Sequence, residues 1–173
     1  MRIVHISDIH LHPEPILGFE PVANFSACLN HVAQFQKDAD LVVITGDLAH
    51  CGLRESYELL RAMIADAGFE GARAPRLLIG NHDDREVFRA AFPEAADDGH
   101  GFVQWSEETE ADIFIYLDTN EPGTHAGRYC DRRSDWLRGE LEGARARGKP
   151  AFLFMHHNPI AVEVANAATI GII

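Results

Sequence analysis

The sequence lacks several features that would place it in a specialised class of protein. No apolar stretch approaches the ~20 residues needed to cross a bilayer, which argues against a membrane partner. The first residues, MRIVHISDIH, lack the basic, apolar and small-residue succession of a signal peptide. The cysteines, Cys28, Cys51 and Cys130, are odd in number and have no CxxC spacing, so a disulfide scaffold is not expected. These absences predict a cytoplasmic protein.

Positive charge is also scarce. Lys and Arg total 15 against 27 Asp and Glu, which gives a formal net charge of −12. Because nucleic-acid-binding proteins usually present a basic face, this balance argues against nucleic acid as a partner. It does not exclude an anionic substrate, since bound cations can reverse the local field. The 173 residues, of which 46% are hydrophobic, suit one globular domain that spans 1–173.

Apolar patterns in the chain predict alternating strands and helices. Short runs of β-branched and aliphatic residues predict buried strands at 2–7, 41–45, 76–79, 102–106, 112–118 and 151–155. Apolar residues three and four apart predict helices at 22–35, 55–67, 85–92 and 134–147. Ser134 is expected to cap the last helix, and an acidic turn at 107–110 to close a hairpin. The pattern indicates an α/β fold with helices packed on a mostly parallel or mixed sheet.

Polar motifs follow four of the predicted strands. They are Asp8-Ile9-His10, Gly46-Asp47, Gly80-Asn81-His82-Asp83 and His156-His157. Open α/β sheets place ligand sites at the carboxyl ends of their strands, so these side chains are expected to converge. Each motif alone has an ordinary explanation, such as turn chemistry or helix capping. Four such accidents in a row are improbable, and the mixture of carboxylate, imidazole and amide donors suits divalent transition metals.

The motifs differ in what their side chains can do. Asp8 and His10 can chelate one metal from one side of a loop. Gly46 permits a tight turn, and the two oxygens of the following Asp47 carboxylate can bridge two metals. In the His156-His157 pair, one imidazole can be a ligand while the other is a loop or supporting residue.

Taken together, the four motifs resemble those of the calcineurin-like metallophosphoesterases. ISDIH is similar to the family's opening DxH, TGDL to its GD, GNHDD to its GNH[DE] and FMHHNP to its single-histidine block. The stretches TGDLAHCGLRESYELL and GNHDDREVF are most similar to the class III cyclic nucleotide phosphodiesterases and the related glycerophosphodiesterases. The resemblance covers the whole chain. It implies a layered α/β/β/α sandwich of mixed sheets flanked by helices.

The resemblance also implies a cofactor, namely two divalent transition-metal ions (Mn, Fe, Co or Zn). Asp8 and His10 would bind the first metal. Asp47 would bridge both metals, and Asn81 and His156 would bind the second. Such a pair of metals can clamp a phosphate and lower the pKa of a bound water to about 7.

His82 is the one side chain that the resemblance assigns to catalysis. It would lie near the phosphate without ligating a metal, and the neighbouring Asp83 is expected to orient its ring. The implied reaction is hydrolysis of a small phosphodiester, such as cyclic AMP or a glycerophosphodiester, by a metal-activated hydroxide. Histidines outside the motifs have no implied role, but His12 and His50 lie close enough to motifs to be candidates for the site.

One departure from the family pattern leaves alternatives open. These families finish with a GHxH motif that gives one more ligand to each metal, and no GHxH occurs here. The resemblance therefore implies a chain without its C-terminal portion, with weakened metal binding and a bare sheet edge. The chain could be a non-catalytic fragment, or it could be a phosphomonoesterase or nuclease of the same superfamily, although the charge of −12 counts against the nuclease. Homo-oligomer formation is also left open.

Overall fold

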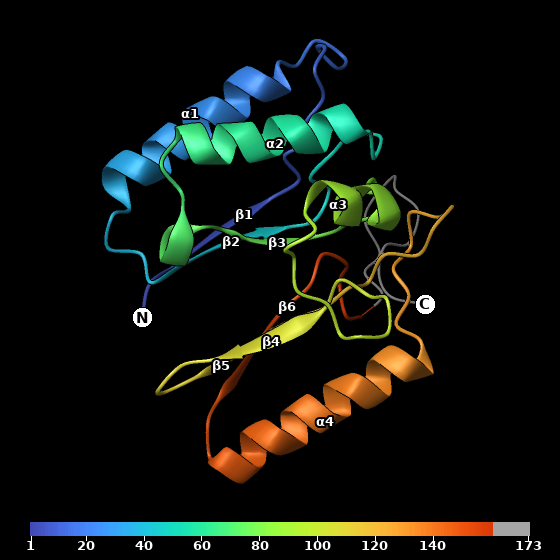
Figure 1. The fold of residues 1–173 in the computed structure, drawn as a ribbon. Coiled ribbons are helices and arrows are strands. Elements are labelled where there is room, and N and C mark those ends of the chain that lie inside the picture. Colours follow the sequence, from blue (N-terminus) through green and yellow to red (C-terminus); the bar gives the residue numbers. More distant parts are fainter. Residues whose placement is uncertain (161–173) are drawn as a thin grey trace.

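The computed structural model describes residues 1–160 of the chain. Two three-stranded sheets lie face to face in the middle of the molecule (Figure 1). Helices α1, α2 and α3 cover the outer side of the first sheet, and α4 covers the outer side of the second (Figure 1). The result is the four-layered α/β/β/α arrangement that the family resemblance implies.

The first sheet is parallel throughout and holds the strands that precede three of the motifs. Its strands lie in the order β1 (Ile3–Ser7), β2 (Leu41–Thr45) and β3 (Arg76–Leu78). Helices α1 (Pro21–Phe35) and α2 (Arg54–Asp66) make the two crossovers. Ser7 pairs with Thr45, and Thr45 pairs with Leu78, so the three strands end level with one another. The loops that follow them therefore begin at one edge of the sheet.

The second sheet is mixed. Strand β4 (Trp105–Glu108) is antiparallel to β5 (Ile113–Tyr116), and β5 is parallel to β6 (Ala151–Phe154). Helix α4 (Asp131–Arg147) connects β5 to β6. The short helix α3 (Arg85–Ala91) follows the third motif.

Three apolar layers hold the sheets and helices together. The largest lies between the first sheet and its helices and includes Phe25, Leu29, Tyr57 and Leu60, all buried. A second joins the sheets, where Leu41, Val43 and Leu78 pack near Phe114 and Tyr116. A third lies under α4 and includes Ile113, Ile115 and Ala144.

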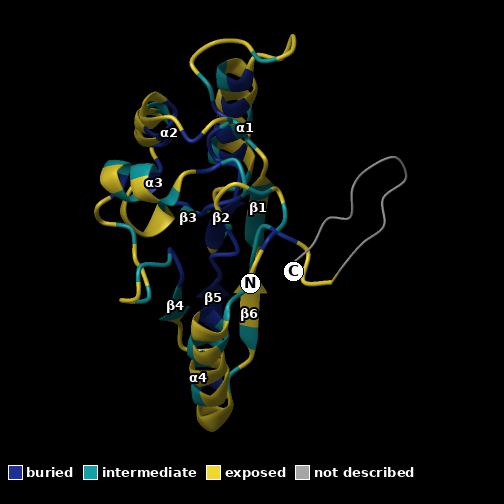
Figure 2. Ribbon diagram, turned by 90° about the vertical axis from the view of Figure 1, so that its right-hand side faces the viewer, coloured by how far each residue is buried: buried dark blue, intermediate teal, exposed yellow. Residues whose placement is uncertain are grey.

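The order of strands and helices is as predicted, with three corrections. Among the strands of residues 1–160, only the central strands β2 and β5 are buried along their whole length, whereas β1 and β6 lie at sheet edges and are partly exposed (Figure 2). Ser134 does not cap α4, because the helix already begins at Asp131, after Cys130. Residues 107 and 108 belong to β4 rather than to the acidic turn, which Thr109 and Asp112 close instead. No helix in the described part of the chain is long and apolar enough to span a bilayer.

Candidate functional site

The loops after β1 and β2 are hydrogen-bonded to each other. The amide of Asp8 donates to the Gly46 carbonyl (3.3 Å), and the amide of His10 donates to the Asp47 carbonyl (2.8 Å). The amide of Gly46 in turn donates to the carbonyl of Leu78 at the end of β3 (2.9 Å). These bonds extend the parallel sheet by a few residues and bring the first two motifs together.

The backbone at the motifs is strained. Asp8, His10 and Asp47 have φ values of 56°, 42° and 49°, in the left-handed region that residues with a side chain rarely adopt. Leu17, at 49°, is the one other such non-glycine residue in the described part of the chain. Each such conformation costs on the order of 1–3 kcal/mol and persists only where the surrounding structure enforces it, most often at functional sites.

Two motif glycines are explained by close approach. A Cβ atom on Gly46 would overlap the ring of His156, and Gly46 also has a φ of +74°. A Cβ atom on Gly80 would overlap the backbone nitrogen and a carboxylate oxygen of Asp47. These glycines let side chains from three loops meet in a space that a methyl group would fill.

Asp47 lies at the centre of the cluster. Its side chain is 5% exposed, and its two oxygens face different imidazoles. Oδ2 is 3.5 Å from Nε2 of His10, and Oδ1 is 3.4 Å from Nε2 of His156. Oδ1 also accepts a hydrogen bond from the backbone amide of His82 (2.9 Å), which holds the carboxylate in place.

The contacts of His156 fit a metal ligand. Its Nδ1 donates to the carbonyl of Thr45 (3.0 Å), so Nε2 carries the lone pair. Nε2 lies 3.2 Å from Oδ1 of Asn81, whose amide nitrogen is instead 3.0 Å from Nδ1 of His125. The lone pair of His156 Nε2 therefore faces Oδ1 of Asn81 and Oδ1 of Asp47, and all three atoms are hydrogen-bond acceptors. Such an arrangement needs a positive charge among the acceptors, either a proton on His156 or a bound cation.

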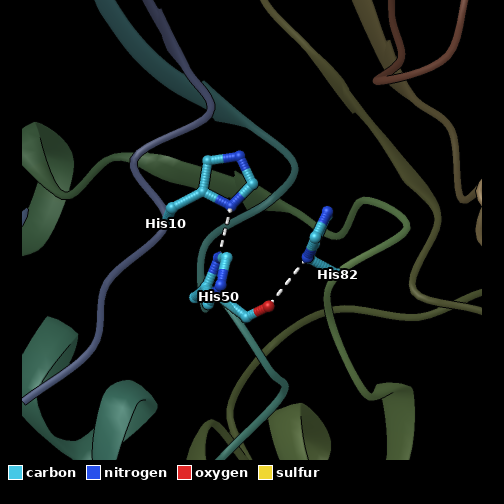
Figure 3. A group of neighbouring side chains, drawn as sticks. All are labelled: His10, His50 and His82. Atoms are coloured by element: carbon cyan, nitrogen blue, oxygen red, sulfur yellow. Dashed lines mark hydrogen bonds between the residues drawn. The ribbon is translucent and has the colours of Figure 1, made fainter. Parts of the chain in front are cut away.

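The side chains form two groups that could each hold a metal ion. In one, potential ligand atoms of Asp8, Asp47 and His156 lie within 4.8 Å of one another. In the other, those of His10, His50 and His82 do so (Figure 3). The structure thus brings all five predicted metal ligands to one edge of the first sheet. Which of them serve the first and which the second metal stays a prediction.

His50 is the member of the second group that the motifs did not single out. Its Nδ1 is 3.5 Å from Nδ1 of His10, and its backbone carbonyl accepts a 2.7 Å hydrogen bond from Nδ1 of His82 (Figure 3). The rings of His50 and His82 are stacked, with an interplanar angle of 17°. Burial lowers the pKa of His50, and burial also lowers that of His10 although the Asp47 carboxylate opposes it. In the sequence, the only indication that His50 belongs to the site was its position three residues after Asp47.

Comparison with known proteins identifies the family to which this chain belongs. The profile of the family described as "Calcineurin-like phosphoesterase" matches residues 1–169. The chain belongs to the calcineurin-like phosphoesterase family. It is 37% identical over 164 residues to a "Probable cyclic nucleotide phosphodiesterase" of Rhodopseudomonas palustris, an alignment that covers 92% of this chain and 58% of the relative.

Two further relatives have related names. The chain is 30% identical to the "Glycerophosphodiester phosphodiesterase GpdQ" of Enterobacter lignolyticus, over 92% of this chain and 58% of the relative. It is 29% identical to the "3',5'-cyclic adenosine monophosphate phosphodiesterase CpdA" of Escherichia coli K12, over 92% of this chain and 56% of the relative. The chain thus spans little more than half the length of these curated relatives.

In this calcineurin-like phosphoesterase, the expected pairing of Asp83 with His82 is wrong. Asp83 is buried and accepts hydrogen bonds from the backbone amides of Leu48 (3.0 Å), Ala49 (2.9 Å) and Gly80 (2.8 Å) and from the hydroxyl of Tyr57 (2.9 Å). Burial raises its pKa to about 6, although these donors oppose the shift. Through these bonds the buried Asp83 carboxylate links the second motif loop to the third. The His50 carbonyl, rather than Asp83, orients the ring of His82.

Of the other histidines near the motifs, one contacts the site residues and two form contacts outside the site. His125, in the loop before α4, reaches Asn81, and its ring lies 5.3 Å from that of His82. Nothing in the sequence indicated this approach across 44 residues. His157 is buried behind His156 and contacts the hydroxyl of Thr119 (Nδ1 to Oγ1, 2.7 Å). His12 makes its hydrogen bonds within its own loop, to Glu14.

Proposed function

We propose that this chain carries the catalytic core of a phosphodiesterase that uses two divalent transition-metal ions. The observation that carries the proposal is the position of Asp47, whose two carboxylate oxygens face two different imidazoles, those of His10 and His156. A carboxylate so placed can ligate two cations at once. Metal pairs that share ligands in phosphoesterases typically lie about 3.5–4 Å apart.

The division of the ligands between the two ions is taken from the family resemblance, and the structure brings potential ligand atoms of Asp8 within 4.8 Å of those of both His156 and Asp47. Asp8 and His10 would share one ion with Asp47, and Asn81 and His156 would share the other. This mixture of nitrogen and oxygen donors favours Mn²⁺, Fe²⁺, Co²⁺ or Zn²⁺ over Mg²⁺ and Ca²⁺. When bound, the ions would polarise the phosphate and supply a nucleophilic hydroxide near neutral pH.

His82 is placed to handle the leaving group. Because its Nδ1 donates to the His50 carbonyl, Nε2 is the atom that can gain and lose a proton. The backbone amide of His82 donates to Oδ1 of Asp47, so the backbone that carries this imidazole is fixed against the carboxylate that would hold the metals. A protonated Nε2 can give its proton to the departing alkoxide, a role typically worth ~10²–10⁴-fold in rate.

The substrate class is proposed from the relatives and from charge. The relatives' names concern cyclic nucleotides and glycerophosphodiesters, so we propose a small phosphodiester for this chain as well. The net charge of −12 counts against a nuclease. A cytoplasmic location remains a prediction from cysteine use, and all three cysteines are free.

A panel of substrates tests the proposal. Cyclic AMP, a glycerophosphodiester, an aryl phosphomonoester and single-stranded DNA are offered to the chain with Mn²⁺, and again after chelation. We expect hydrolysis of diesters that chelation abolishes and Mn²⁺ restores. Hydrolysis of the monoester alone would favour the phosphomonoesterase. No hydrolysis would favour the non-catalytic fragment, and the genomic sequence past codon 173 would then be searched for GHxH and the longer product assayed.

A further inference from the structure

A cavity of about 500 Å³ opens directly beside the histidine group. His10, His50 and His82 line one end of it, together with Asp8. The rest of the lining comes from the end of β1, from the loop before α1 and from the first half of that helix. This part is mostly apolar, with Ile9, Ile16, Phe19, Phe25 and Cys28. The metal chemistry proposed above uses none of these apolar residues.

A tight turn holds one aromatic side chain at this cavity. Ile16 and Phe19 exchange two backbone hydrogen bonds, of 3.0 Å and 2.8 Å. The two residues between them, Leu17 and Gly18, have positive φ values of 49° and 83°, as a tight primed turn requires. The backbone of Phe19 is thereby fixed, yet its side chain lines the cavity and the residue is 68% exposed. An aromatic ring left exposed on a fixed turn can bind a flat partner at little cost in conformational entropy.

We propose that the cavity takes the flat aromatic group of the substrate, the nucleobase of a cyclic nucleotide, while the phosphate lies at Asp47. This inference rests on the proposed function and narrows its substrate class. The volume falls in the range of small-molecule sites, which are mostly apolar with a few polar groups. Phe19 offers a face on which a base can stack, and stacking tolerates any base because all have a π-face. Asn24, an exposed residue in the lining, carries an amide that can donate to and accept from a base edge.

The same lining disfavours the other substrate named among the relatives. A glycerol moiety carries hydroxyl groups that need hydrogen-bond partners when they leave water. The walls formed by Ile9, Ile16 and Phe25 offer none, because their side chains are hydrocarbon. This leaves the amide of Asn24 as the hydrogen-bonding group on the α1 side of the cavity. A glyceryl ester would therefore gain little from this cavity and would be bound through its phosphate.

The test compares two substrates and two exposed phenylalanines. Phe19→Ala removes the stacking face, and Phe35→Ala is the matched control, because Phe35 is 58% exposed at the far end of α1 and lines no part of the cavity. We expect Phe19→Ala to lower kcat/KM for cyclic AMP about ten-fold, mainly through KM, and to leave a glycerophosphodiester within about two-fold. Phe35→Ala should change neither substrate, and Phe19→Trp should restore cyclic AMP hydrolysis.

Binding of adenosine, which has no phosphate, gives a readout that needs neither metal nor turnover. We expect titration with adenosine to show binding to the wild type and to Phe19→Trp, and about ten-fold weaker binding to Phe19→Ala. The inference would be overturned if Phe19→Ala lowered kcat/KM equally for both substrates, or if it left the affinity for adenosine unchanged. Either result would leave the proposed phosphodiesterase activity unaffected. Adenosine binding that depends on Phe19, without hydrolysis of any diester, would instead remove the proposed function and keep the cavity as a nucleobase site.

Discussion

The Nδ1 atom of His82 lies 2.7 Å from the backbone carbonyl oxygen of His50. A carbonyl oxygen can only accept, so Nδ1 carries the hydrogen and the tautomer of His82 is set by its neighbour. The side chain of the same His50 approaches His10, a proposed metal ligand, at 3.5 Å. One residue in the loop after β2 therefore orients both the proposed proton donor and a proposed ligand.

His82→Ala should keep its metals and lose rate, chiefly in kcat. We expect a loss of ~10²–10⁴-fold with a substrate whose leaving alkoxide needs a proton. The loss should be smaller with a nitrophenyl diester, because a nitrophenolate leaves without one. Steady-state kinetics on both substrates, with metal content measured on the same samples, checks this. Loss of a metal, or an equal loss on both substrates, would show that His82 is a ligand or a structural residue instead.

His50→Ala should weaken metal binding without touching a proposed ligand. An imidazole that ligates a metal through one nitrogen is usually held through the other, and removal of that partner typically costs about 10–100-fold in affinity. We expect a loss of this size in calorimetric Mn²⁺ titrations. His12→Ala is the control, since the ring of His12 lies 6.4 Å from that of His50 but forms its hydrogen bonds with Glu14 in its own loop. Equal affinities for the two variants would show that His50 does not support His10.

Gly46→Ala should disrupt the site more than its backbone angle alone explains. The new methyl group would overlap the ring of His156 as well as sit at a φ of +74°. Gly68→Ala is the matched control, because Gly68 has a φ of +76° and nothing within 4 Å of its Cβ position. Both variants should lose about 1–2 kcal/mol in unfolding free energy from the left-handed conformation. Only Gly46→Ala should also lose metal binding, and retained binding there would contradict the close approach of His156.

Stability should fall as the metal-free protein is acidified below neutral pH, partly because of His157. Burial lowers the pKa of His157 to about 4 from an ordinary 6.5, and the neighbouring His156 adds to the shift. Between these pH values the unfolded chain binds more protons than the folded one. The contribution of His157 to the free energy of unfolding is therefore fully present above pH 6.5 and is lost as the pH falls towards 4. Urea unfolding in EDTA between pH 7 and 4.5 should show a shallower loss for His157→Gln than for the wild type. Identical slopes would mean that His157 does not titrate in this window.

The fold was largely predictable because short β-branched runs mark the strands in the sequence. In the structure the strands of the first sheet are parallel and end level with one another. Each motif therefore emerges at the same edge of the sheet, as at Ser7 and Thr45. The start of α4 was not predictable, because tertiary contacts determine it. Arg133, in its first turn, is 2% exposed and donates to the carbonyls of Asp118 (2.9 Å) and Asn120 (3.2 Å). A polar sequence gives no sign of such burial.

The site was predictable in its ligand types but not in its supporting contacts. Asp83 was expected to orient His82 because the two are adjacent in sequence, yet the turn sends the Asp83 carboxylate towards the Tyr57 hydroxyl in the core. His50 and His125 join the cluster through loop geometry that no motif encodes. The left-handed backbone at Asp8 was equally hidden, since it depends on the hydrogen bonds between the two loops.

Anomalous X-ray diffraction from crystals grown with Mn²⁺ tests the central claim, that two cations flank the Asp47 carboxylate, most directly. The account predicts two peaks about 3.5–4 Å apart, one next to His10 and one next to His156. In His10→Ala the peak next to His156 should remain, whereas Asp47→Ala should lose both peaks or keep one weakly, and should lose more activity. A single peak in the wild type, or peaks that do not contact Asp47, would contradict the account.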